Sequence, residues 1–381
     1  MSGAAGAGEP RGAFEAFYLA YLSLWARFVV RRRKPIVVGI TGSVGKTTTR
    51  EFVAAVLREA PEAVGPVGAT PRNMNHDWGV PLTLLGYRHW IPRWNSELLR
   101  ALTVPLKALK LATVGPYPRV LVLEFAVGRG TEIERTVALA PPEIGVVTAI
   151  GPAHLNAYGT VERIAEVKGA VVRAVPASGL VVLGADSPLA AGMDRDTEAE
   201  VVKVPGKGRA LSAGIARVVA ARLGVPAARV ERALARGVTV RSRQEEFPFR
   251  GGTVMNDAFN ANPMSMAHGL ETLAERARPG QRRVAILGWM GALGDAAERY
   301  HREMAPVAHA SADVVVGVGE MARLYDPDHW FETSEACADA LPDLLDDGDY
   351  VFVKGSNSVN LYVVVQALRN DLQPASASTP G

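Results

Sequence analysis

The sequence predicts an α/β protein with two domains, each built on a mostly parallel sheet. The chain has 381 residues, of which 48% are hydrophobic, and this is more than one hydrophobic core usually holds. Short apolar runs alternate with helical patterns along the whole length, as expected for strands joined by crossover helices. The strands are almost continuously apolar, which indicates that helices cover both faces of each sheet.

The charge and cysteine content exclude several classes of function. The net charge is only +3 and is spread over 81 charged residues, so no basic stripe is present and nucleic acid is not an expected partner. Cys337 is the single cysteine, which excludes an internal disulfide and a thiolate zinc cluster. These features are typical of a protein of the reducing cytoplasm.

The N-terminal segment combines aromatic and basic residues. Residues 1–12 are small and polar, and we expect them to be disordered. Residues 13–30 are apolar but too short and too charged for a membrane span, and residues 31–34 are all basic. Five aromatic residues recur at spacings of four and three, which predicts an amphipathic helix with an aromatic stripe formed by Phe14, Tyr18, Tyr21, Trp25 and Phe28. This helix either attaches to an anionic membrane or a partner protein, or packs on its own domain.

A glycine loop separates the first strand from the first helix after it. The β-branched run at 35–41 predicts a strand, and the segment from Lys46 onwards has helical periodicity. Such a loop binds phosphate through backbone amides, while Lys46 neutralises the β- and γ-phosphates and the Thr47 hydroxyl binds Mg²⁺. The predicted nucleotide-binding residues are Gly42, Ser43, Val44, Gly45, Lys46, Thr47 and Thr48.

Three further residues are candidates for a metal site. Glu124 ends the buried strand 119–125, at the edge of the sheet where open α/β sheets place their ligands. The strand 144–150 leads to His154 at the same edge, and the next helix carries Lys168. No one of these residues alone indicates a metal site. Together, and beside a phosphate loop, they predict a catalytic metal site.

These motifs in this order resemble the Mur ligase family, and most closely its D-alanyl-D-alanine-adding branch. The resemblance covers residues 35–368 and rests on the segments TGSVGKTTT, NMNHDWGVP, LEFAVGRGTEI, AHLNAYGT, NDAFNANPMSM, LGWMGALG and VKGSN. It implies a disordered start and aromatic helix over 1–34, a P-loop ATP-binding central domain over 35–240, and a Rossmann-like C-terminal domain over 241–381.

The resemblance also implies cofactors and roles for individual residues. ATP would bind with two Mg²⁺ ions, one held by Thr47 and Glu124 and the other by His154 and a carbamylated Lys168. The catalytic residues would then be Lys46, Glu124, His154 and Lys168. The remaining implied contacts are Asn260 and Asn262 to the nucleotide, and Asn73, Asn75, His76, Arg243 and Lys354 to the substrate.

The implied activity is the ATP-dependent joining of a carboxylate to an amine through an acyl phosphate. Its partners would be small-molecule or peptide substrates, and we expect a monomer in the cytoplasm or at the inner membrane face. Family enzymes also carry an N-terminal domain for the UDP-sugar, whereas only 34 residues precede the first strand here. Two alternatives therefore stay open, a ligase for a non-UDP acid and a nucleotide-binding scaffold without activity.

Overall fold

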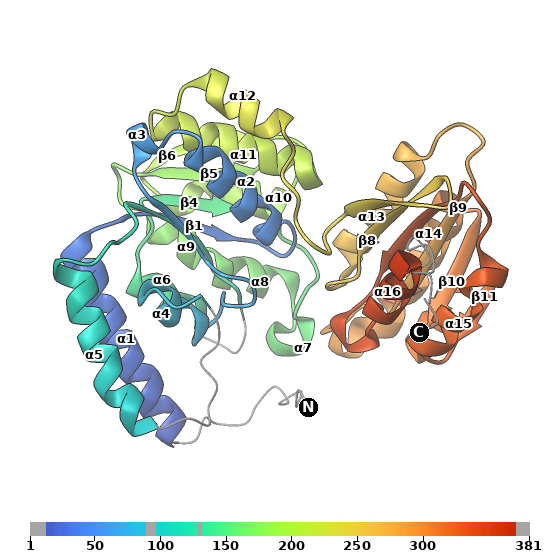
Figure 1. Cartoon of the computed structure of the whole chain (residues 1–381), viewed down its shortest axis with the longest axis horizontal. Coiled ribbons are helices and arrows are strands. Elements are labelled where there is room, and N and C mark those ends of the chain that lie inside the picture. Colours follow the sequence, from blue (N-terminus) through green and yellow to red (C-terminus); the bar gives the residue numbers. More distant parts are fainter. Residues whose placement is uncertain (1–12, 89–96, 128–131, 371–381) are drawn as a thin grey trace, which may run out of the picture. The chain divides into compact units, whose positions relative to one another are not determined.

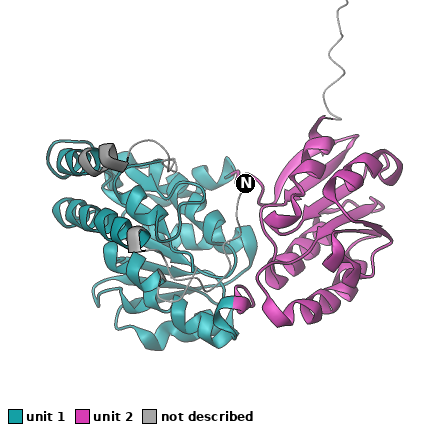
Figure 2. Ribbon diagram, turned by 90° about the horizontal axis from the view of Figure 1, so that it is seen from below, with its two compact units in different colours: residues 1–151, 157–238 teal, residues 152–156, 239–381 magenta. Residues whose placement is uncertain are grey.

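The computed structural model describes residues 13–88, 97–127 and 132–370, which form two compact units (Figure 2). Unit 1 comprises residues 1–151 and 157–238, and unit 2 comprises residues 152–156 and 239–381. The disorder predicted for residues 1–12 concerns residues outside the described ranges.

Unit 1 is built on a sheet of six parallel strands in the order β2-β3-β1-β4-β5-β6 (Figure 1). Its strands are almost fully buried at the centre of the sheet, because helices cover both faces. The strands are β1 (Ile36–Thr41), β2 (Val67–Ala69), β3 (Val120–Glu124), β4 (Ile144–Val147), β5 (Leu180–Gly184) and β6 (Glu200–Val204).

Helices α2 and α11 pack together on one face of this sheet, and α6, α8 and α9 lie on the other (Figure 1). Helix α1 packs beside α5 and α4. The helices of the described chain up to residue 238 are α1 (Ala13–Arg33), α2 (Lys46–Arg58), α3 (Pro61–Val64), α4 (Gly79–Leu84), α5 (Glu97–Thr113), α6 (Glu132–Leu139), α7 (Leu155–Tyr158), α8 (Val161–Lys168), α9 (Ala170–Arg173), α10 (Pro188–Ala191), η1 (Gly192–Asp196), α11 (Gly208–Arg222) and α12 (Ala227–Ala235).

Unit 2 contains a second six-stranded sheet in the order β11-β10-β9-β12-β8-β7. All its strands are parallel except β7, which forms a hairpin with β8 at the edge. Its strands are β7 (Glu245–Phe249), β8 (Gly252–Asp257), β9 (Arg283–Gly288), β10 (Val314–Val318), β11 (His329–Phe331) and β12 (Tyr350–Lys354). Its helices are α13 (Pro263–Arg276), η2 (Gly294–Ala296), α14 (Ala297–Ser311), η3 (Glu320–Tyr325), α15 (Ser334–Leu344), η4 (Asn357–Val359) and α16 (Tyr362–Asn370).

The predicted fold class, with two mostly parallel sheets covered by helices, is therefore confirmed. The edge strand β7 was not predicted. Pro248 interrupts its apolar pattern and cannot donate to a ladder, which an edge strand tolerates. The turn that joins β7 to β8 has positive φ at Arg250 (40°) and Gly251 (74°), as two-residue hairpin turns require.

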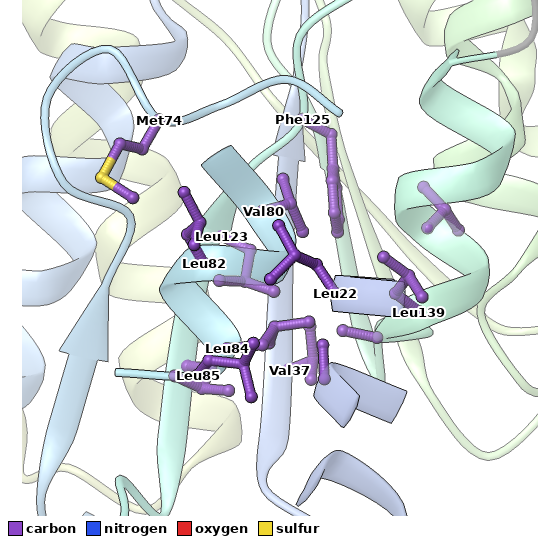
Figure 3. Packing of buried hydrophobic residues seen from close by; sticks show 14 of the residues in the cluster. Leu22, Val37, Met74, Val80, Leu82, Leu84, Leu85, Leu123, Phe125 and Leu139 are labelled. Carbon is purple, nitrogen blue, oxygen red and sulfur yellow. The ribbon is translucent and has the colours of Figure 1, made fainter. Parts of the chain in front are cut away.

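Helix α1 packs on its own unit, as one of the two alternatives predicted. Leu22, Ala26 and Val29 are at most 1% exposed and join a cluster that includes Val37 of β1 (Figure 3). The predicted aromatic stripe is only partly on the face that packs. Three of its members, Tyr18, Tyr21 and Trp25, lie against this cluster, whereas Phe28 is 40% exposed and the side chain of Phe14 is outside the described part.

The described residues contain no helix with the length and apolar content that crossing a membrane requires.

Two leucines of α1 offer a test of this packing. Replacing Leu22 by Ala removes a buried side chain and should lower the free energy of unfolding by roughly 2–5 kcal/mol. The matched control is Leu24→Ala in the same helix, where Leu24 is 65% exposed and the change should stay below about 0.5 kcal/mol. Urea unfolding followed by circular dichroism measures both variants, and equal losses would mean that α1 does not pack as described.

Candidate active site

The phosphate loop connects β1 to α2 through a backbone that only glycine can adopt. Gly42 has φ of 148°, and a Cβ atom there would lie 2.0 Å from the hydroxyl of Thr148. Gly45, with φ of 81°, precedes the first residue of α2. The loop therefore directs its backbone towards the N-terminus of a 13-residue helix, the arrangement that favours bound phosphate.

Residues that follow β4 hold the loop in place. The Thr148 hydroxyl donates to the Val44 carbonyl oxygen at 2.5 Å, and the Ser43 amide donates to the Ala149 carbonyl oxygen at 2.6 Å. The Ser43 hydroxyl donates to the Gly151 carbonyl oxygen at 2.9 Å. Because these bonds fix the loop before any ligand arrives, little reorganisation is needed when phosphate binds.

Two lysines meet at one carbonyl group of the loop. Lys46 Nζ lies 2.7 Å and Lys168 Nζ lies 2.9 Å from the Gly42 carbonyl oxygen. Lys168 is fully buried, and burial lowers the pKa of its ammonium group far below the usual range; the Lys46 charge lowers it further, while Glu124 acts in the opposite direction. Burial therefore favours the neutral, nucleophilic amine of Lys168 over its ammonium form.

Glu124 lies at the carboxyl end of β3 and is 2% exposed. Its carboxylate accepts hydrogen bonds from Thr47 Oγ1 at 3.0 and 3.2 Å and from Asn75 Nδ2 at 2.7 Å. It also forms an ion pair with Arg50, whose Nη1 lies 3.2 Å from Oε2. The structure thus brings together Thr47 and Glu124, the two residues predicted to hold the first Mg²⁺.

The donor set at this position suits magnesium. A hydroxyl and one carboxylate beside a phosphate loop are typical of Mg²⁺ sites, since this ion takes one or two carboxylates and completes its shell with phosphate oxygens and water. No group of three or more His, Cys, Asp or Glu residues forms a metal site within the described residues. With one hydroxyl and one carboxylate as protein ligands, the site suits an ion whose other ligands come from a nucleotide and water.

Arg50 and the contact of Asn75 with Glu124 were not predicted. Asn75 was assigned to the substrate, but its amide donates to the predicted metal ligand. Arg50 is 3% exposed and lies three residues after Thr47, on the same face of α2. That spacing is the signal in the sequence that could have identified Arg50.

The predicted residues of unit 2 cluster at the carboxyl ends of β8 and β12. Lys354 is 1% exposed, and its Nζ lies 2.5 Å from Asp257 Oδ2 and 3.0 Å from the Asn260 carbonyl oxygen. Burial lowers the pKa of Lys354, and the Asp257 carboxylate opposes this effect. Lys354 thus holds the segment that presents Asn260, whose side chain is exposed.

Two neighbouring residues also have structural partners. The Asn262 side chain accepts a hydrogen bond from the Ser265 amide and forms a capping box at the start of α13. The Arg243 guanidinium lies 4.5 Å from the centre of the Phe259 ring. These contacts position the segment around Asn260, and nucleotide or substrate binding by Asn262 and Arg243 stays a prediction.

The other predicted residues lie on loops. Asn73 is exposed with φ of 61°, and His76 is half-buried in the same loop before α4. His154 has φ of 58° in the segment 152–156 of unit 2, and its predicted role as a metal ligand stays a prediction. Thr48 is half-buried in the first turn of α2. Residues 128–131 of the motif after Glu124 are outside the described residues.

A phosphate loop, a strand-end carboxylate and a buried lysine in one α/β unit, followed by a second parallel α/β unit, define a nucleotide-binding enzyme. Comparison with known sequences identifies its family. The Mur ligase middle domain matches residues 40–222, and the Mur ligase glutamate ligase domain matches residues 241–357. The chain belongs to the Mur ligase family.

Its relatives include enzymes named UDP-N-acetylmuramoyl-tripeptide–D-alanyl-D-alanine ligase. The one from Mycobacterium tuberculosis is 30% identical over 88% of this chain and 73% of its own length. The one from Escherichia coli is 27% identical over 92% of this chain and 80% of its own length.

Solved structures share the fold. MurF from Thermotoga maritima in complex with ADP superposes with a TM-score of 0.76 at 23% identity, over 93% of this chain and 84% of that one. FolC from Escherichia coli in complex with ADP superposes with a TM-score of 0.63 at 15% identity, over 93% of this chain and 98% of that one.

The Arg50–Glu124 pair yields a stability test. Arg50→Met leaves a buried carboxylate without its cation and should lower the free energy of unfolding of unit 1 by about 3 kcal/mol. Arg50→Lys should recover part of this loss. The control Arg163→Met removes an exposed ion pair with Glu166 and should change little. Thermal unfolding compares the three variants, and equal effects of Arg50→Met and Arg163→Met would rule out a structural role for the buried pair.

Proposed function

We propose that this protein is an ATP-dependent ligase that joins a carboxylate to an amine through an acyl phosphate. The observation that carries the proposal is the group formed by Lys46, Glu124 and Lys168 around the phosphate loop. The names of the relatives support D-alanyl-D-alanine as the amine and a UDP-muramoyl tripeptide as the acid. A ligase for an acid without UDP is the second candidate, because His76, Trp289 and Asn357 stand where the resemblance to the family implies Asn, Asp and Arg.

The proposed reaction has two steps. The substrate carboxylate attacks the γ-phosphorus of ATP, which forms an acyl phosphate and releases ADP. The amine then attacks the acyl carbon, so that phosphate leaves, the C–N bond forms and the amine loses a proton. Lys46 would turn from the Gly42 carbonyl towards the phosphates and neutralise charge there. Thr47 and Glu124 would hold Mg²⁺, which supplies further charge neutralisation.

Arg50 and Asn75 would keep Glu124 in position for this role. Both donate to its carboxylate, so its orientation is fixed. Asn260, held through its carbonyl by Lys354, is the proposed nucleotide contact of unit 2. The exposed side chain of Asn260 supports this assignment.

Lys168 is the proposed site of carbamylation. A neutral lysine amine attacks CO₂, forms an N–C bond and releases one proton, which leaves a carbamate anion. Burial and the Lys46 charge lower the pKa of Lys168, which favours the neutral amine that this step needs, and the Lys46 charge would also favour the carbamate anion. The carbamate would supply an anionic oxygen ligand for a second Mg²⁺.

Carbamylation can be observed directly. In ¹³C-labelled bicarbonate, the protein should show a carbamate carbon resonance that is absent from Lys168→Arg, because arginine does not form a stable carbamate. Lys203→Arg, at a lysine paired with Asp194 on the surface, is the matched control and should keep the resonance. The carbamate role is contradicted if the wild-type spectrum matches that of Lys168→Arg.

The activity is tested by measuring ADP and phosphate release together with product mass. Mg-ATP and D-alanyl-D-alanine are supplied with the UDP-muramoyl tripeptide or with the same tripeptide lacking UDP. Turnover should require both acid and amine, and Lys46→Met or Lys168→Ala should reduce it about 100-fold or more. Lys203→Met should leave it unchanged, since this lysine is exposed and lies in β6.

The choice of acid separates the two ligase candidates. Amide formed only with the UDP compound supports the first, and amide formed equally without UDP supports the second. ATP binding without turnover of any pair, unaffected by Lys168→Ala, would favour a non-catalytic scaffold.

A further inference from the structure

The exposed large hydrophobic side chains are concentrated on one part of unit 1. Among the residues whose exposure the structure describes, every large hydrophobic side chain that is exposed belongs to α1, to α5 or to the residue just after α5. They are Phe17 (71%), Leu24 (65%), Phe28 (40%), Leu106 (67%), Leu109 (45%) and Val114 (85%). We call this set the apolar surface of α1 and α5.

Helix α1 therefore has two apolar faces, of which one is exposed and the other is buried. Phe17, Leu24 and Phe28 are spaced by seven and four residues, so they share one face of the helix. The buried residues Leu22 and Ala26 belong to another face, which packs on unit 1. Packing within the unit explains the second face but not the first, and clustered exposed hydrophobic residues mark interaction sites.

Helix α5 shows the same division. Val104 and Ala108 are fully buried, whereas Leu106 and Leu109 between and after them are exposed. The two helices lie side by side (Figure 1). The Arg33 guanidinium at the end of α1 donates to the carbonyl oxygens of Leu111 and Gly115 at the end of α5. The two helices therefore form one surface element with their C-terminal ends joined.

The same element has a more positive net charge than the chain as a whole. Residues 13–34 and 97–114 contain eight Lys and Arg residues and two Glu residues, a net charge of +6. The whole chain has a net charge of +3, so the remaining residues together carry −3. Four of these basic side chains, Arg27, Arg31, Arg32 and Lys34, are exposed on or just after α1.

We propose that α1 and α5 dock the protein on the surface of an anionic lipid bilayer. The apolar surface would enter the boundary between headgroups and acyl chains, and the basic side chains would contact lipid phosphates. The charge argues for lipid over a second copy of the chain, since two +6 surfaces repel each other. Docking goes beyond the proposed ligase reaction and does not depend on it.

The experiment measures co-sedimentation of the full chain with vesicles. Vesicles of phosphatidylcholine with phosphatidylglycerol should bind the protein, vesicles of phosphatidylcholine alone should bind it at least about tenfold less, and high salt should release it. The triple variant Phe17→Asn, Leu24→Asn and Phe28→Asn should lose binding by about tenfold or more while keeping its circular dichroism spectrum and ATP binding.

A charge-matched pair of variants separates a specific surface from general electrostatics. Arg27→Gln, Arg31→Gln and Arg32→Gln should weaken binding to anionic vesicles about tenfold or more. Arg299→Gln, Arg302→Gln and Arg323→Gln remove the same charge from exposed positions of unit 2 and should retain binding.

Three results would overturn the proposal. The first is equal binding to neutral and anionic vesicles, or none to either. The second is an equal loss of binding to anionic vesicles in the two triple arginine variants. The third is a dimer in light scattering that the asparagine variant dissociates, which would assign the surface to a second copy of the chain.

Discussion

The parallel pairing of β1 with β3 on one side and β4 on the other is the constraint on which the site in unit 1 depends. The register places Ile40 beside Glu124 and Thr41 beside Val147. Three chain segments therefore leave the sheet at the same edge: the phosphate loop, the end of β3 and the turn after β4. Carboxyl ends of neighbouring parallel strands meet in this way in open α/β sheets, so residues far apart in sequence can act on one ligand.

This edge gathers basic groups around a single buried acid. Lys46, Arg50 and Lys168 all interact with Glu124 or with the loop beside it. Burying charge is costly unless it is paired, and the structure limits the cost by pairing Glu124 with Arg50. Burial also lowers the pKa of Lys168. The remaining positive charge, on Lys46 and the start of α2, suits a polyphosphate.

The sequence alone was enough to predict those features whose residues are close together in the chain. A strand, two glycines, a lysine and a threonine within a few residues predicted the loop around Gly42, and the apolar run before Glu124 predicted β3. Both signals are short, since the chemistry constrains adjacent residues. The alternating elements of unit 2 were predictable for the same reason, because each strand and helix has its own periodicity.

Contacts between distant segments were not predictable in this way. Arg50 resembles any basic residue of an amphipathic helix until α2 is placed against β3, and Asn75 reaches Glu124 only because its loop crosses that strand end. In α1 the large aromatic residues dominated the pattern, while the smaller Leu22, Ala26 and Val29 form the line that is fully buried. The buried face follows Leu22, Ala26 and Val29, and it includes Tyr18, Tyr21 and Trp25 of the predicted stripe but not Phe28.

The path of the chain from α1 into the sheet ties the surface helix closely to the site. Only Lys34 and Pro35 separate the last residue of α1 from the first residue of β1, and Lys34 has φ of 46° while proline fixes its own φ. β1 then runs directly into Gly42. Helix α1 and the phosphate loop are therefore joined by only the segment 34–41, most of which is the interior strand β1.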